Sequence, residues 1–137
     1  MRLLFDVNVI IDLLADRKPF ADAAAAVMAR VETGAVTGLL AAHTVTTVFY
    51  LLNRHLGRER AHEATMDLLR LVQVVPVDHD RLLQALAMNW ADFEDAVQTA
   101  CAAKANADYI LTRNKQDFRG ASVEVLSPAE FLALTSG

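Results

Sequence analysis

Short apolar runs alternate along this chain with longer segments that have the composition of helices. The strand-like runs are 3–5, 72–77, 109–111 and 123–126, with 38–42 as a weaker candidate. β-branched residues and flanking charges favour strands in such short runs. The helical segments are 7–15, 20–31, 44–56, 60–71, 81–88 and 92–105, with a last short helix after Ser127 and Pro128. This alternation predicts an α/β layer fold with a mostly parallel sheet.

The length of the chain fits one domain. Its 137 residues lie in the usual range for a single domain, so we expect residues 1–137 to form one unit. A composition of 54% hydrophobic and 22% charged residues excludes a disordered polar chain. The single cysteine, Cys101, excludes a disulfide framework and a thiolate zinc cluster. One free thiol suits a reducing compartment, so we expect a cytoplasmic protein.

The longest uncharged segment does not have the pattern of a membrane span. Residues 33–53 carry no Asp, Glu, Lys or Arg over 21 residues, but threonines and glycines interrupt their apolar character. We interpret the segment as a buried strand followed by the start of a helix. The opening apolar run is cut by Asp6, Asn8 and Asp12, so we expect no signal peptide and no membrane association.

Polar side chains gather at positions that a parallel sheet would bring to one edge. Ligands bind beyond the carboxyl ends of the strands in such sheets. The residues concerned are Asp6 and Asn8, Asp92, Glu94 and Asp95, and Asn114 and Asp117. Two carboxylates about 5 Å apart repel by roughly 3 kcal/mol at an effective dielectric constant near 20, so such a cluster needs a cation or bound protons. Oxygen ligands without Cys favour Mg²⁺ or Mn²⁺, which suit phosphodiester hydrolysis.

A purely structural interpretation is open for each of these residues. Asp6 and Asp92 are suitable N-caps, and Asp95 would then occupy the first helical turn, where the helix dipole favours a carboxylate. Asn114 and Asp117 could form a turn. The agreement of three chain segments on one sheet edge is what favours a site.

The chain resembles PIN-domain proteins, and especially the toxin ribonucleases of VapC type. Residues 3–9 resemble the family's opening strand with its Asp-x-Asn motif, and residues 92–96 resemble the segment with its central acid. Residues 111–114 and 117–118 resemble its closing Thr-Arg-(Asp/Asn) and Asp-Phe segments. Each motif is short, but their order and spacing are more specific. The resemblance extends over essentially the whole chain.

The resemblance implies a three-layer α/β/α sandwich and a Mg²⁺- or Mn²⁺-dependent endoribonuclease that hydrolyses RNA with metal-activated water. By position, the catalytic acids would be Asp6, Asp95 and Asp117. Asp92 would join them as a metal ligand, and Asn8, Thr112, Asn114 and Glu94 would be polar supports. The resemblance also implies a toxin that forms a homodimer and binds a cognate antitoxin protein. Its most apolar helix face, 44–52, is our candidate contact surface.

One departure from the family pattern is an absent acid. The family usually has a glutamate in the helix after its second strand. No Asp or Glu occurs between Glu32 and Glu59, and the expected position falls near Val48 or Phe49.

Two consequences of the absent acid remain open. Asp92 or Glu94 could substitute for it. The alternative is a catalytically weak or inactive PIN-fold module that binds RNA or protein without cleaving it.

The charge of the chain excludes a strongly basic nucleic-acid coat but not local contact with RNA. The formal net charge is −4, and five of the acids belong to the candidate site segments. Arg113, Lys115 and Arg119 flank these segments and could neutralise RNA phosphates. The other interpretation is that they belong to a solvated loop.

Overall fold

The computed structural model, which describes residues 1–136, contains one sheet of five parallel strands in the order β3-β2-β1-β4-β5. The strands are β1 (Arg2–Phe5), β2 (Thr37–Ala41), β3 (Gln73–Val75), β4 (Tyr109–Leu111) and β5 (Glu124–Leu126). All five expected runs form strands, and 123–126 supplies an edge strand as expected. β3 is shorter than expected because Val72 still belongs to the end of a helix, where its amide donates to Leu68 O, and Pro76 has no amide hydrogen.

Seven α-helices and one 3₁₀-helix connect the strands within residues 1–136. They are α1 (Val7–Leu14), α2 (Ala21–Glu32), α3 (Ala42–Leu56), α4 (Arg58–Leu71), α5 (His79–Met88), α6 (Phe93–Lys104), η1 (Lys115–Phe118) and α7 (Pro128–Thr135). Gly57 separates α3 from α4 with a φ of 87°, a conformation that glycine adopts without strain. The expected helix at 81–88 begins earlier because the Asp78 side chain accepts from the Arg81 amide and caps it.

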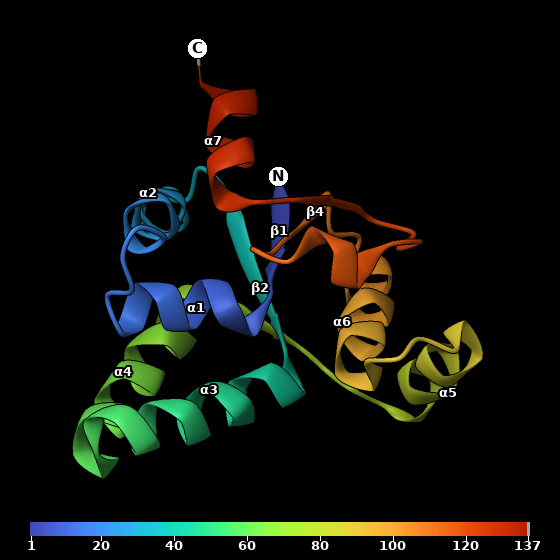
Figure 1. Ribbon diagram of the computed structural model, residues 1–137, viewed down its shortest axis with the longest axis horizontal. Coiled ribbons are helices and arrows are strands. Elements are labelled where there is room, and N and C mark those ends of the chain that lie inside the picture. Colours follow the sequence, from blue (N-terminus) through green and yellow to red (C-terminus); the bar gives the residue numbers. More distant parts are fainter. Residues whose placement is uncertain (137) are drawn as a thin grey trace.

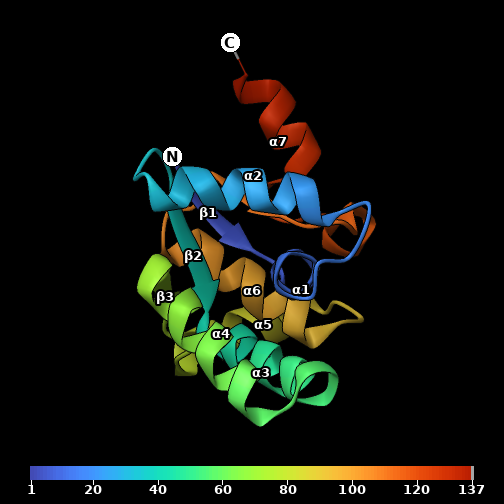
Figure 2. The same cartoon turned by 90° about the vertical axis from the view of Figure 1, so that its left-hand side faces the viewer.

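The helices cover both faces of the sheet, which confirms the expected α/β sandwich (Figure 1). Side chains alternate along β1, so Leu3 and Phe5 pack into one core and Leu4 into the other. The first core includes residues of α1, α2, α3, α4 and α7, and the second includes residues of α5 and α6. Figure 2 shows the first group from its own side, with α2 lying across the strands.

The chain reverses its direction across the sheet between β1 and β4. It proceeds from β1 outward through β2 to β3, and then returns to place β4 on the opposite side of β1. Phe5 pairs in register with Leu111, so Asp6 and Thr112 follow neighbouring strand ends, and the Asp6 amide donates to Leu111 O at 2.9 Å. A reversal of this kind opens a crevice at the carboxyl ends of the two strands.

The uncharged segment 33–53 forms β2 and most of α3, as expected. Among residues 1–136, no helix combines the length and the apolar character required to cross a membrane.

Candidate active site

Asp6 lies buried at the point where β1 and β4 end side by side. It is the N-cap of α1, and its Oδ1 accepts from the Val7 amide at 2.7 Å. The same oxygen accepts from Gln98 Nε2 at 3.0 Å, and Oδ2 accepts from Thr112 Oγ1 at 2.7 Å. The N-cap interpretation is therefore correct for Asp6, and the residue also has contacts to two distant elements.

Gln98 joins Asp6 to Asp95. Asp95 occupies the first turn of α6, and its Oδ1 accepts from Gln98 Nε2 at 3.3 Å. One amide nitrogen thus contacts two carboxylates, and the Gln98 residue is only 3% exposed. This contact brings together two of the acids that the sequence placed at one sheet edge.

The environment of Asp95 resists a negative charge. Burial, together with repulsion from Asp6, Asp92, Asp117 and Glu94, raises the pKa of Asp95 to about 7. In the described part of the chain, no ion pair involves Asp6 or Asp95. The acids therefore approach one another without a basic side chain to balance them.

The remaining acids lie at the rim of this pair. Asp92 is exposed and caps α6, with its Oδ1 accepting from the Asp95 amide at 3.0 Å. Glu94 is also exposed, and its backbone oxygen is 3.2 Å from His43 Nε2. Asp117 is exposed on η1 and shares with Asp92 a groove of about 290 Å³ that also contains Arg119.

Thr112 organises the polar residues beside Asp6. It is fully buried, and its Oγ1 accepts from Asn8 Nδ2 at 3.4 Å and from the Asn114 amide at 3.1 Å while donating to Asp6. Asn8 Oδ1 accepts from the Arg113 amide at 3.3 Å. Asn114 precedes η1, whose single turn includes Asp117, so the turn interpretation of these two residues is also correct.

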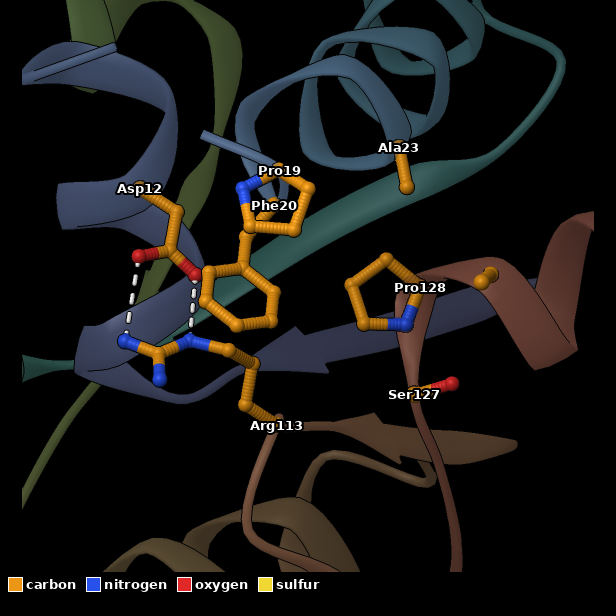
Figure 3. Close-up of a pocket in the computed structure, with 8 residues that line it drawn as sticks. Asp12, Pro19, Phe20, Ala23, Arg113, Ser127 and Pro128 are labelled. Atoms are coloured by element: carbon orange, nitrogen blue, oxygen red, sulfur yellow. Dashed lines mark hydrogen bonds and ion pairs between the residues drawn. The ribbon is translucent and has the colours of Figure 1, made fainter. Parts of the chain in front are cut away.

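Two of the three basic residues have acidic partners within the chain. Arg113 Nε and Nη2 donate to the buried carboxylate of Asp12 at 2.6 and 3.1 Å, as Figure 3 shows. The guanidinium lies 4.3 Å from the centre of the Phe20 ring, beside a pocket of about 240 Å³. Lys115 pairs with Glu130 at 3.0 Å, whereas Arg119 is exposed and has no ion pair among residues 1–136.

Sequence reasoning missed Gln98 and Asp12. Gln98 lies three residues after Asp95, so both project from one helical face, and a glutamine in an Ala-rich segment was the available signal. Asp12 is a carboxylate within the otherwise apolar α1, where a buried acid requires a partner. In neither case does the sequence identify the distant partner.

Apolar side chains stand at the positions where the family's helix glutamate was expected. Val48 is fully buried in the core, so a charge at that position would be costly, and Phe49 is partly buried and packs against the same core. Leu52 is also buried, and only part of the 44–52 face, including Tyr50, is exposed. The site is therefore built from fewer acids than the family pattern has.

The donor chemistry of the site suits a hard divalent cation. Carboxylate oxygens are the preferred ligands of Mg²⁺, and Asp6 Oδ2 accepts only the Thr112 bond within residues 1–136. No three His, Cys, Asp or Glu side chains of the described residues are already arranged as a ligand set. The residues fit the ion in type and charge, with the Asp6–Asp95 pair as the centre.

The comparisons with known proteins agree on one fold. A family model described as PIN domain matches residues 2–116. The VapBC2 structure from Rickettsia felis, bound to a DNA fragment from its promoter, has a TM-score of 0.74 at 10% identity, over 93% of this chain and 98% of the other. A toxin–antitoxin complex from Klebsiella pneumoniae has a TM-score of 0.70 at 22% identity, over 92% and 97%. The sarcin-ricin loop cleaving toxin VapC20 from Mycobacterium tuberculosis has a TM-score of 0.66 at 20% identity, over 79% and 86%. The search of curated proteins gave no match.

Proposed function

Because the chain belongs to the PIN-domain family, we propose that it is a divalent-metal-dependent endoribonuclease and the toxin of a toxin–antitoxin pair. The observation that carries this proposal is the half-buried Asp95 carboxyl, held against Asp6 and near Asp92 and Asp117 without a basic partner among residues 1–136. Acids held in this way need a cation or a bound proton, and a divalent cation would displace the proton. The fold similarity to toxin structures supports the same class of function.

The proposed roles follow from position. Asp6, Asp95 and Asp117 are the catalytic acids, and with Asp92 they would hold Mg²⁺ or Mn²⁺. A divalent ion bound there would supply an activated water molecule and neutralise charge on the phosphate. Thr112 fixes Asp6 by donating to its Oδ2, and Asn8 and Asn114 fix Thr112 in turn.

The three basic residues proposed to contact RNA are not equally available to do so. Arg119 borders the groove that contains Asp92 and Asp117, so it is the residue best placed to meet an RNA phosphate. Arg113 and Lys115 could contribute only in competition with Asp12 and Glu130.

The proposal is tested by RNA cleavage with titrated Mg²⁺ or Mn²⁺. Wild-type protein should cleave RNA only with the metal, and Asp6→Asn should abolish cleavage and any growth arrest on expression. Asp80→Asn, an exposed acid on α5, is the matched control and should cleave like wild type. Unchanged cleavage by Asp6→Asn would contradict the assignment of the site.

The packing of Val48 and Phe49 favours one second candidate. With the helix glutamate absent, the protein could bind RNA or a protein without cleaving it. RNA binding that is independent of metal, with no cleavage of any RNA tested, would support this candidate over the first.

The proposed partners are a cognate antitoxin and a second copy of the chain. The structures from Rickettsia felis and Klebsiella pneumoniae are toxin–antitoxin assemblies, the first with DNA. Co-expression with the product of a neighbouring short reading frame should give a stable complex that lacks ribonuclease activity. Light scattering on the isolated protein tests the dimer.

A further inference from the structure

The Gln98 amide is the only group within residues 1–136 that donates to both Asp6 and Asp95. Its Nε2 lies 3.0 Å from Asp6 Oδ1 and 3.3 Å from Asp95 Oδ1. An amide nitrogen carries two hydrogens, so each carboxylate can receive one. Both bonds are charge-assisted when the acids are ionised, which makes them stronger than bonds between neutral groups.

The same side chain has an oxygen without a partner. Gln98 Oε1 is buried and has no hydrogen-bond partner in the described residues. Turning the amide would place this oxygen against two carboxylate oxygens, so contact with the acids fixes its orientation. A buried acceptor without a bond costs about 1–3 kcal/mol, and an apolar residue of similar shape would avoid that cost. Packing alone therefore does not explain a glutamine here.

We infer that Gln98 is a positioning residue that keeps the Asp6 and Asp95 carboxylates beside one another, where a divalent cation could bind both. This inference rests on the proposed function of the site. In a site without the family's helix glutamate, a neutral donor brings together one acid from the N-cap of α1 and one from α6 without adding a further negative charge. The buried, fixed amide also prevents the pair from separating when no cation is bound.

Gln98→Met tests the inference because methionine retains much of the shape and removes both donors. Gln84→Met, on the exposed surface of α5, is the matched control. Groups that orient metal ligands typically contribute 10–100-fold to metal affinity or activity. We expect Gln98→Met to weaken Mg²⁺ binding by about that factor in calorimetry and to lower kcat with little change in KM for RNA. Gln84→Met should match wild type in both measurements.

A double-mutant cycle on the metal-free protein gives a readout that does not depend on activity. At pH 8, Gln98→Met should lower the folding equilibrium constant about tenfold in the wild-type background, because the loss of two charge-assisted bonds outweighs the relief of the unpaired Oε1. In the Asp95→Ala background the same substitution should have a clearly smaller effect, because one of its acceptors is already absent.

The outcomes separate this inference from the proposed function. Wild-type protein that binds Mg²⁺ without cleaving RNA would contradict the proposed function, while weaker binding by Gln98→Met would still support positioning. If Gln98→Met instead binds Mg²⁺ like wild type, or has equal effects on folding in both backgrounds, then Gln98 has only a packing role and the inference is wrong. Should wild-type protein bind no Mg²⁺, the cation role is wrong, and the cycle alone reports whether Gln98 holds the acids.

Discussion

Asp95→Asn should stabilise the metal-free protein above neutral pH. Burial and the neighbouring acids raise the pKa of Asp95 from its ordinary value of 3.8 to about 7. Between these two pH values the folded protein holds a proton that the unfolded chain has lost. By linkage, the free energy of unfolding falls as the pH rises from about 4 to 7 and stays at the lower level above 7. Asparagine has no charge at any of these pH values, so it removes this loss.

The gain in the free energy of unfolding expected for Asp95→Asn is moderate because Asp95 is only half buried. A change in pKa from 3.8 to about 7 corresponds to roughly 4 kcal/mol before solvent screening. Screening by water reduces the effect to about 1–2 kcal/mol, or roughly 3–8 °C in Tm for a domain of this size. The gain should be about a third as large at pH 5, where the folded wild type is mostly protonated at this residue. Asparagine keeps an oxygen that can accept from Gln98, so the bridge itself is retained.

Unfolding followed by circular dichroism in EDTA at pH 4, 5 and 8 measures this dependence. Asp80→Asn is the control, since its difference from wild type should not grow between pH 5 and pH 8. Adding Mg²⁺ at pH 8 should stabilise wild type more than Asp95→Asn, because the cation binds the folded carboxylate. An equal gain at pH 5 and pH 8, or no gain at pH 8, would refute the electrostatic reasoning.

Substitutions at four further positions test how the fold is held together. Arg113→Met leaves the buried Asp12 carboxylate unpaired and should lower the free energy of unfolding in urea at pH 8 by about 3–5 kcal/mol. Lys115→Met breaks an exposed ion pair and should lower it by only about 0–1 kcal/mol. Equal losses would contradict the argument from burial. Gly38→Ala places a Cβ 3.0 Å from the Phe5 ring and should lower the free energy of unfolding by about 1–3 kcal/mol, measured by thermal unfolding. Unchanged stability would mean that the core rearranges around the new methyl group without strain. Ser127→Ala removes the capping box of α7 and should cost about 1 kcal/mol by the same method, with threonine at this position restoring most of it.

The architecture was predictable because its determinants are local. The apolar run 109–111 and the glycine at position 57 specify a strand and a helix break without reference to the rest of the chain. Helix starts were less accurate, since the cap at Asp78 competed with the apolar pattern that begins later. The 3₁₀-helix at 115–118 was not expected, because one turn has too few residues to show a period.

The candidate site was predictable only where the sheet edge organises it. Asp6 and Thr112 follow paired strands, so the topology alone brings them together. Gln98 and Asp12 lie inside helices, where the local pattern gives each a face but no partner. Their contacts depend on how α6 and α1 pack against the sheet, which no short motif encodes.

The net charge of the chain also does not show where the charged side chains lie in the folded protein. The formal net charge of −4 treats every acid and base as equivalent. In the folded chain, Asp12 and Glu130 already balance Arg113 and Lys115, whereas Asp6 and Asp95 share an uncharged amide. Asp6 and Asp95 therefore have no basic side chain to balance them among residues 1–136, and a bound cation would remove part of the negative charge there. Under the proposed function, RNA binding should therefore strengthen when divalent metal is added.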